Sequence, residues 1–499
     1  MVLIGSGLGL GAYLFLRPSL DPGSTLGSTF SIADQRYKEA RDLEVNGELT
    51  LARLKYTQAR ELFERQGNQD KLNQANEGIA RTLQLAEDYS LDMPAVLQLM
   101  SQKIRHFQSN DLNNWELQGL VESKIIDGQR RYFTNLIENM AYQDPQIAQR
   151  LIGWNEYHTA LAGQLTPFVF GNPNQSRIQV LQNPRTFQAN CRVKFDYTKL
   201  PPYQTVSCWI PYPILAPSQT EVHLISVNPP ASLLYPPQLD REIGAAYVEM
   251  KNTNNQDLYL DLSYSFKTYE ISPQINPDLV GTYNPEDELY QRFTKSEPHL
   301  EQSTQMKELA AQIVAEEENP YRKAQRIYNW IQDNIKLSHV SYPLVSASSA
   351  SHYVLDKKAG DSTLQAFLFT NLCRTAGVPA RVNSGYRLIP GYEAPWTWAE
   401  FYLPNYGWIP VDPAMAKTIC LARGFSEAQK ERIKEYYFGH LDPYRLLINQ
   451  TAPGSLYPVK TTERNMSLVF QQPEAEAGRQ NISPATIDYS INFKTIELP

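Results

Sequence analysis

The chain has 499 residues, more than one ordinary domain holds, so about three domains of about 100–200 residues each are expected. Its composition, 42% hydrophobic and 20% charged, excludes collagen-like, coiled-coil and wholly disordered proteins. The net charge of −7 includes no long basic run, which argues against a nucleic-acid partner. Four cysteines and seven histidines occur without zinc-site spacing, so neither a metal nor another cofactor is predicted.

The N-terminus begins with an apolar segment. Residues 2–16 carry no charge, and a helix of that length covers about 22 Å, less than the ~30 Å hydrocarbon core of a bilayer. A secretory signal peptide would have basic residues before this run and a cleavage site after it, and neither is present. We interpret residues 1–17 as a membrane anchor and 18–31 as a Gly/Ser/Pro linker, with the protein on the extracytoplasmic side (periplasm or cell surface). The alternative is a buried helix or strand.

Residues 32–170 have a mainly helical pattern. Ala52, Tyr56, Ala59 and Phe63 share one helical face, and Gly67-Asn68 ends that helix. A second amphipathic helix has its inner face at Leu72, Ala75, Ile79, Ala80, Leu83 and Ala86. The pair resembles one tetratricopeptide-type hairpin, although an ordinary helical spacer is favoured because only one copy occurs. The helical pattern is expected to continue from 112 to 152, through Ile125-Ile126-Asp127-Gly128.

Residues 171–275 change to period-two alternation. Leu258, Leu260, Leu262, Tyr264 and Phe266 alternate with polar residues and Tyr259, as in a half-buried strand, so a β-sandwich module of immunoglobulin-like size is predicted. Cys191 and Cys208 flank a Pro201-Pro202 turn. If the module lies outside the cytoplasm, we predict a disulfide between them across a hairpin.

Helices resume at Thr304, and Asn319-Pro320 is a favourable start for the next one. A third helix follows Gly360 and ends at Gly377, which is placed as a C-cap before Pro379. Two strands are expected at 382–388 and 398–403, and a third follows at Gly407-Trp408-Ile409-Pro410-Val411-Asp412-Pro413.

The stretch from about 300 to 416 resembles the transglutaminase-like superfamily, whose papain-like fold packs a core helix on an antiparallel sheet. Family members read G-x-C at the helix start, L-C-R-x-A-G-[IV]-P-A-R at its end, then H-x-W-x-E and G-W-x-x-V-D-P in successive strands. This chain matches at Gly360, 372–381, Trp398, Glu400 and 407–413. Together with the patterns above, the resemblance predicts an α+β fold. It consists of the helical region, the β-sandwich module, a transglutaminase-like domain at 290–420 and a C-terminal helix and β extension at 421–499.

The family's catalytic triad is not intact in this chain. The cysteine position is occupied by Ser362 and the histidine position by Trp396, whereas the aspartate is retained as Asp412. A serine without a base is not a nucleophile near neutral pH, and an indole cannot accept a proton. Ser362 is therefore expected to act as a plain N-cap, and Asp412 to cap a turn or bind Thr397 or a backbone amide. His339 and His352 precede the core helix and are the candidates for a relocated base.

Three functions remain open. The first is a non-catalytic, membrane-anchored binding or scaffolding protein of the cell envelope or of a membrane complex, with a protein partner. The second is an active acyltransferase or cysteine-protease-type hydrolase with a relocated base. The third is a receptor in which an aromatic cluster stacks on sugars or cations; its members would be Trp396, Trp398, Tyr402, Tyr406 and Trp408.

Overall fold

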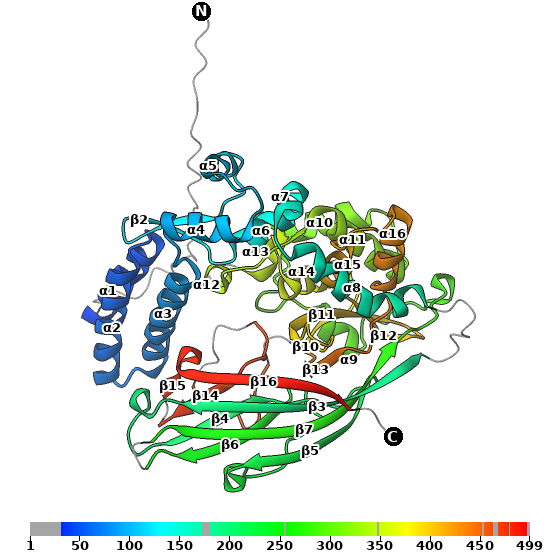
Figure 1. Cartoon of the computed structure of the whole chain (residues 1–499). Helices are drawn as coiled ribbons and strands as arrows, with labels where there is room; N and C mark the ends of the chain where they lie inside the picture. The colour runs from blue at the N-terminus through cyan, green and yellow to red at the C-terminus, as the bar shows by residue number, and fades with distance from the viewer. Residues whose placement is uncertain are drawn as a thin grey trace, which may run out of the picture.

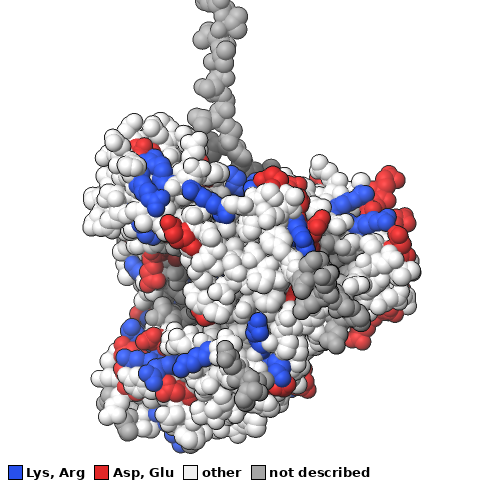
Figure 2. Space-filling model, turned by 45° about the vertical axis from the view of Figure 1, so that its right-hand side comes forward, with Lys and Arg blue, Asp and Glu red and all other residues white. Residues whose placement is uncertain are grey.

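The protein consists of three bodies (Figure 1): a helical N-terminal region, a two-sheet β module and an α+β body. Residues of all three line a central groove. The computed structural model describes residues 31–171, 180–253, 256–346, 349–451, 454–462, 468–478 and 480–496. Charged side chains of both signs are interspersed over the face in Figure 2.

The N-terminal region starts with three packed helices, α1 (Ile32–Val45), α2 (Leu49–Arg65) and α3 (Gln69–Asp88). The predicted inner face of α2 is confirmed, because Ala52, Tyr56, Ala59 and Phe63 are all at most 1% exposed. Tyr56 lies against Gly78 of α3, where an added Cβ would come within 2.5 Å of the ring. The further helices are α4 (Met93–Lys103), α5 (Ser109–Leu117), α6 (Leu136–Gln143), α7 (Pro145–Arg150) and α8 (Trp154–Phe170).

The expectation of continuous helix from 112 to 152 is wrong. Strands β1 (Ser123–Ile126) and β2 (Gln129–Tyr132) form an antiparallel hairpin in this stretch. Its two turn residues, Asp127 and Gly128, have φ values of 49° and 74°. An Asp-Gly pair suits such a turn, because both of its central residues need positive φ. The Asp-Gly signal therefore outweighs the helical spacing around it.

The β module consists of two four-stranded sheets that share one core. One sheet has the order β16 (Ile487–Ile496), β3 (Leu181–Phe195), β7 (Leu258–Ile271), β5 (Gln219–Asn228). The other has the order β15 (Gln480–Ile482), β14 (Glu474–Ala477), β4 (Thr205–Pro211), β6 (Ala245–Lys251). The alternation predicted for β7 is confirmed, since Leu260, Leu262, Tyr264 and Phe266 are at most 1% exposed. The C-terminal strands thus complete both sheets of the module.

The predicted hairpin between Cys191 and Cys208 does not form, and the disulfide prediction is wrong. Cys191 lies on β3, opposite Leu262 and Ile491, whereas Cys208 lies on β4, opposite Val248 and Ala475. The chain crosses from one sheet to the other between them, and both cysteines are free, buried thiols.

The α+β body packs helices on a four-stranded antiparallel sheet. The order is β12 (Gly407–Val411), β11 (Ala394–Leu403), β10 (Ala380–Arg387), β13 (Arg445–Asn449). Its central helix is α14 (Ser362–Thr375), in which all but one of 14 residues are buried. The other elements are α9 (Glu288–Thr294), α10 (Thr304–Val314), α11 (Pro320–Asn334), β8 (Lys336–Leu337), α12 (Tyr342–Ser346), α13 (Ala350–Lys357), β9 (Ala359–Gly360), α15 (Pro413–Cys420) and α16 (Glu427–Tyr436). Asn319 caps α11 as predicted, accepting from the N–H groups of Tyr321 and Arg322.

The predicted membrane anchor, residues 1–17, and nearly all of its linker lie outside the described residues. Within the described ranges, no helix combines the length and the apolar character that crossing a bilayer requires.

Candidate functional site

Ser362 is the first residue of α14, but it is not the helix cap. Asp361 is the cap, because its carboxylate accepts from the N–H of Leu364 at 2.9 Å. The prediction that Ser362 is a plain N-cap is therefore wrong by one position. Ser362 is 9% exposed, and its hydroxyl accepts from the N–H of Thr397 at 3.4 Å.

Trp396 lies on β11, beside Gly385 of β10. A side chain at Gly385 would not fit, since its Cβ would lie 1.9 Å from the carbonyl oxygen of Leu446. The indole N–H of Trp396 donates to the Asp412 carboxylate at 2.8 Å, and the Arg387 guanidinium lies 4.8 Å from the indole centroid. The Trp396 indole therefore links β11 to the start of α15 by a donated hydrogen bond.

Asp412 is fully buried at the start of α15. It caps this helix, accepting from the N–H of Met415 at 2.9 Å, so the predicted bond to a backbone amide is confirmed. The alternative partner, Thr397, instead hydrogen-bonds with the Thr363 hydroxyl at 2.9 Å. Arg445 forms an ion pair with Asp412 at 2.9 Å. Burial raises the pKa of Asp412, and the charge of Arg445 opposes that rise.

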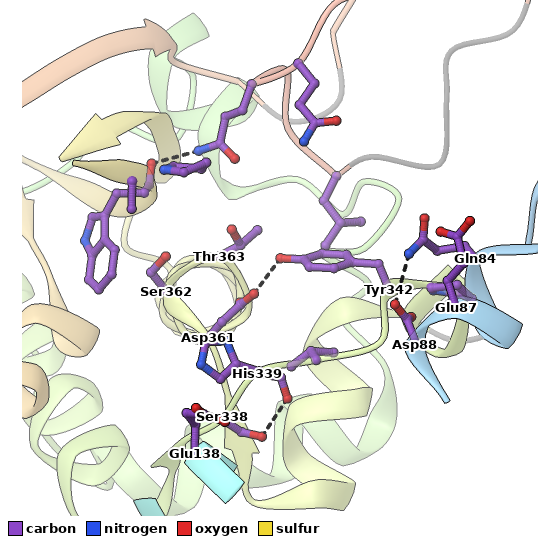
Figure 3. Close-up of a pocket in the computed structure, with 18 of the residues that line it drawn as sticks. Gln84, Glu87, Asp88, Glu138, Ser338, His339, Tyr342, Asp361, Ser362 and Thr363 are labelled. Carbon is purple, nitrogen blue, oxygen red and sulfur yellow. Dashed lines mark hydrogen bonds between the residues drawn. The ribbon is translucent and has the colours of Figure 1, made fainter. Parts of the chain in front are cut away.

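The groove over this site has a volume of about 1180 Å³, and Ser362 and Trp396 both line it. Figure 3 shows Asp361, Ser362 and Thr363 at the start of α14, with Tyr342 between Asp361 and the acidic end of α3. The Tyr342 hydroxyl donates to the Asp361 carboxylate at 2.8 Å. The groove therefore extends from Ser362 and Trp396 to the N-terminal helices.

The two candidate histidines lie in different places. His339 lines the groove, and burial lowers the pKa of its imidazole, although Glu138 and Asp361 oppose this effect. No hydrogen bond joins its ring to Ser362 among the described residues. His352 points elsewhere, because its Nε2 lies 2.7 Å from the hydroxyl of Ser303, the cap of α10.

The predicted aromatic cluster does not form one surface. Trp396 lines the groove, whereas Trp398 is 2% exposed in a core with Ile214 and Leu447. Tyr402 and Trp408 pack edge to face at the far end of β11, and the Arg381 guanidinium lies 4.0 Å from the centroid of Trp408. Tyr406 is separate from these two residues and packs against the core around α14. Residues at alternate positions of a strand lie on the same face of the sheet, but these side chains are too far apart along the strand to contact one ligand.

Sequence reasoning missed three residues that shape the site: Arg445, Asp361 and Tyr342. Arg445 bridges two buried aspartates, pairing with Asp442 at 2.7 Å as well as with Asp412. Asp442 is three residues from Arg445 in sequence, but the contact with Asp412 joins distant parts of the chain, so no local pattern marks it. Asp361 had a signal, since an aspartate directly before a helix is a favourable N-cap. Among the described residues, no group of three or more His, Cys, Asp or Glu side chains is arranged to hold a metal ion.

A model of the transglutaminase-like superfamily matches residues 307–413. This part of the chain is a transglutaminase-like domain. The match contains α14 and the three strands β10, β11 and β12, together with the positions of Ser362, Trp396 and Asp412. The resemblance read from the sequence motifs is thus confirmed.

Three further comparisons describe what the chain is similar to. An uncharacterized protein of Haemophilus influenzae is 25% identical over 237 residues, which are 42% of this chain and 64% of that relative, so the match spans less than two thirds of its length. A candidate cysteine protease from Cytophaga hutchinsonii has 17% identity and a TM-score of 0.40, covering 64% of this chain and 93% of that one. The periplasmic domain of TgpA from Pseudomonas aeruginosa has 15% identity and a TM-score of 0.24, covering 49% and 91%.

Proposed function

We propose that this protein is a non-catalytic transglutaminase-like protein that acts by binding a protein partner. The observation that carries the proposal is the hydrogen bond from the Trp396 indole to Asp412. In the family's chemistry, a base must take a proton from the nucleophile while an aspartate orients that base. The indole nitrogen is a donor only, so Trp396 can occupy the place of the base but cannot carry out its task.

The other two triad positions support the same proposal. Ser362 has a hydroxyl, which stays protonated near neutral pH, in place of a thiol that a helix N-terminus would help to ionise. Asp412 is committed to Met415 N–H, Trp396 and Arg445, all within 2.9 Å. The three residues therefore brace α14, β11 and α15 against one another.

The same proposal places the protein at the cell envelope, as a tethered component of a membrane assembly. Its support is the uncharged run at residues 2–16 and the Gly/Ser/Pro-rich segment after it. A tether of this kind would leave the folded part free to reach a partner, since the first described helix begins at Ile32. The partner and the extracytoplasmic side are parts of this proposal.

A second candidate is an acyltransferase or peptide hydrolase with a relocated base. One observation favours it: His339 lines the same groove as Ser362. Because burial lowers the pKa of His339, its imidazole would be neutral near pH 7, the state that a general base requires. The Ser362 hydroxyl accepts from the N–H of Thr397, however, and among the described residues no hydrogen bond joins it to a base that would take its proton.

Turnover separates the two candidates. Purified full-length protein is tested for amine incorporation, deamidation and peptide hydrolysis, with Ser362→Ala and His339→Ala as matched variants. We expect no turnover above that of the variants. Turnover that both variants lose would refute the non-catalytic function and support the relocated base.

Restoring the family residues provides a second measurement. Ser362→Cys alone and Ser362→Cys with Trp396→His are compared by their rates of alkylation with iodoacetamide. The thiol of the double variant should react about tenfold faster, because an imidazolium beside a helix N-terminus lowers a thiol pKa. Equal rates in the two variants would show that position 396 does not face the nucleophile position.

A further inference from the structure

The central groove has two walls from separate parts of the chain. One wall is α3, and the other contains the start of α14, the indole of Trp396 and residues of the C-terminal segments 468–472 and 481–484. Its volume of about 1180 Å³ exceeds the about 300–1,000 Å³ that is usual for small-molecule sites. In Figure 2 the outline of the molecule is indented between the N-terminal helices and the β module. The volume of the groove therefore suits an extended segment of a polymer better than a compact metabolite.

Both walls present apolar side chains to the groove. The sequence predicts Ile79, Ala80 and Leu83 on the inner face of a helix, but they line the groove and Leu83 is 37% exposed. The opposite side of α3 carries the buried residues that pack on α1 and α2. Trp396 lies on the other wall. Ile79 also packs in part against Ala40, Ala52 and Tyr56, so the stripe is only partly covered by its own chain. A partly uncovered apolar stripe on a helix is typical of a surface that binds a partner.

The polar groups of the groove are acidic where it meets α14. Glu87 and Asp88 of α3 and Asp361 before α14 line this end, and none of the three forms an ion pair among the described residues. Asp88 accepts from Gln84 and Ser341, and Asp361 from Tyr342 and Leu364, all of them neutral donors.

The positive side chains that line the groove are largely committed elsewhere. Lys103 pairs with Glu138 at 2.8 Å, and Arg387 stacks on Trp396 while donating to Tyr157 and Tyr392. Arg60 is the other lining cation, and it belongs to α2. His339 faces Asp361, but burial lowers the pKa of its imidazole, which is then neutral near pH 7. The carboxylates beside α14 therefore lack a compensating charge from the described residues.

We propose that the groove binds an extended segment of a partner protein in which lysine or arginine alternates with apolar residues. Its cations would lie against Asp361, Asp88 and Glu87, and its apolar side chains between Leu83 and Trp396. Charge complementarity selects this occupant, since an acidic segment would meet uncompensated carboxylates. The inference rests on the proposed function, because it names the kind of partner that the non-catalytic protein binds.

The test uses full-length protein and three fluorescent peptides of about ten residues, which span about 30 Å when extended. One alternates Leu with Lys, one Leu with Glu, and one Gly with Lys. We expect the Leu-Lys peptide to bind with a Kd in the micromolar range and to weaken as salt is raised. The other two should bind at least about tenfold more weakly, because each lacks one of the two complementary features.

Matched variants locate the site. Asp361→Asn keeps a good helix cap, and Glu87→Gln changes an exposed residue; each should weaken Leu-Lys binding by about tenfold. Leu83→Arg should abolish binding, whereas Leu54→Arg, at a residue that is 52% exposed on α2 and does not line the groove, should leave it unchanged.

Equal binding of the Leu-Lys and Leu-Glu peptides, an equal effect of Leu54→Arg, or no binding at all would overturn the inference. Lipid vesicles or glycan oligomers that bind the protein and lose binding in Leu83→Arg would also overturn it, because the groove would then serve another occupant. These readouts do not involve turnover. A chain that lacks turnover and fails to bind the peptide refutes this inference alone, whereas turnover lost in Ser362→Ala refutes the proposed function.

Discussion

Replacing Trp396 by phenylalanine separates the hydrogen bond to Asp412 from the packing of the ring. A phenyl ring keeps most of the apolar contact and a stacking partner for Arg387, whose guanidinium lies 4.8 Å from the indole centroid. It cannot donate, so a contact of 2.8 Å to a fully buried carboxylate is lost. Asp412 keeps Arg445 and the N–H of Met415, so the carboxylate is not left without partners.

The size of the effect follows from these contacts. A hydrogen bond to a charged group contributes about 1.5–3 kcal/mol, and removing one partner of a buried acceptor costs a similar amount. The smaller ring adds a packing loss of up to about 1 kcal/mol, because Trp396 is only half-buried. We therefore expect Trp396→Phe to lower the free energy of unfolding by about 1.5–4 kcal/mol.

The control is Trp408→Phe. Trp408 is also half-buried and stacks under a guanidinium, that of Arg381 at 4.0 Å, but its indole nitrogen makes no hydrogen bond among the described residues. Urea unfolding followed by circular dichroism at pH 7 should show a loss below about 1 kcal/mol for this variant.

A loss for Trp396→Phe no greater than for Trp408→Phe would refute the bracing role of the bond to Asp412. A double-mutant cycle with Asp412→Asn measures the coupling directly, and a coupling near zero would lead to the same conclusion. The Trp396→Phe loss should also shrink in acid. A protonated Asp412 needs the donor less, and burial already raises the pKa of this group.

Four further outcomes follow from the structure. Burial lowers the pKa of Lys417 to about 7, so between pH 7 and 10 only the unfolded chain holds this proton. The stability of the wild type should therefore rise relative to that of Lys417→Met by up to about 1.4 kcal/mol per pH unit over this range. Parallel curves of stability against pH for the two proteins would show that the ammonium is solvated. Burial lowers the pKa of His158 to about 4, so stability should fall between pH 6.5 and 4 by about 3 kcal/mol more than in His158→Gln; thermal melts across this range check it. Ellman's reagent should find four thiols in the denatured chain, and a count of two would restore the disulfide between Cys191 and Cys208. The native protein should react slowly, and first at Cys420, which is half-buried. Deleting residues 1–29 should release a soluble protein with an unchanged melting temperature, because α1 begins at Ile32 with Ser31 as its cap. Aggregation or a much lower melting temperature of the deletion variant would show that the segment is structural.

The sequence by itself determined the elements whose signals are local. The inner face of α2 and the alternation of β7 follow from residue spacing, because burial on one face repeats with the period of the element. The cap of α11 follows from residue type, because Asn319 can accept from the first N–H groups of the helix and Pro320 needs no acceptor. The motif order also assigned Ser362, Trp396 and Asp412 to the family's triad positions, and the family match spans all three, while the loss of catalysis stays a prediction. At 123–132, two competing local signals were present, and the turn chemistry of Asp127-Gly128 prevailed over the helical spacing.

Tertiary structure decided which elements meet. Cys191 and Cys208 lie on consecutive strands of the chain, β3 and β4, but these strands belong to opposite sheets. Strands from the C-terminus pair with them instead, β16 with β3 and β14 with β4. Strand pairing is a contact between distant residues, so a local pattern shows that a strand exists without naming its partner. The same reason applies to the site: Arg445 reaches Asp412, and α3 faces Asp361, through the packing of separate elements, which no spacing within one element records.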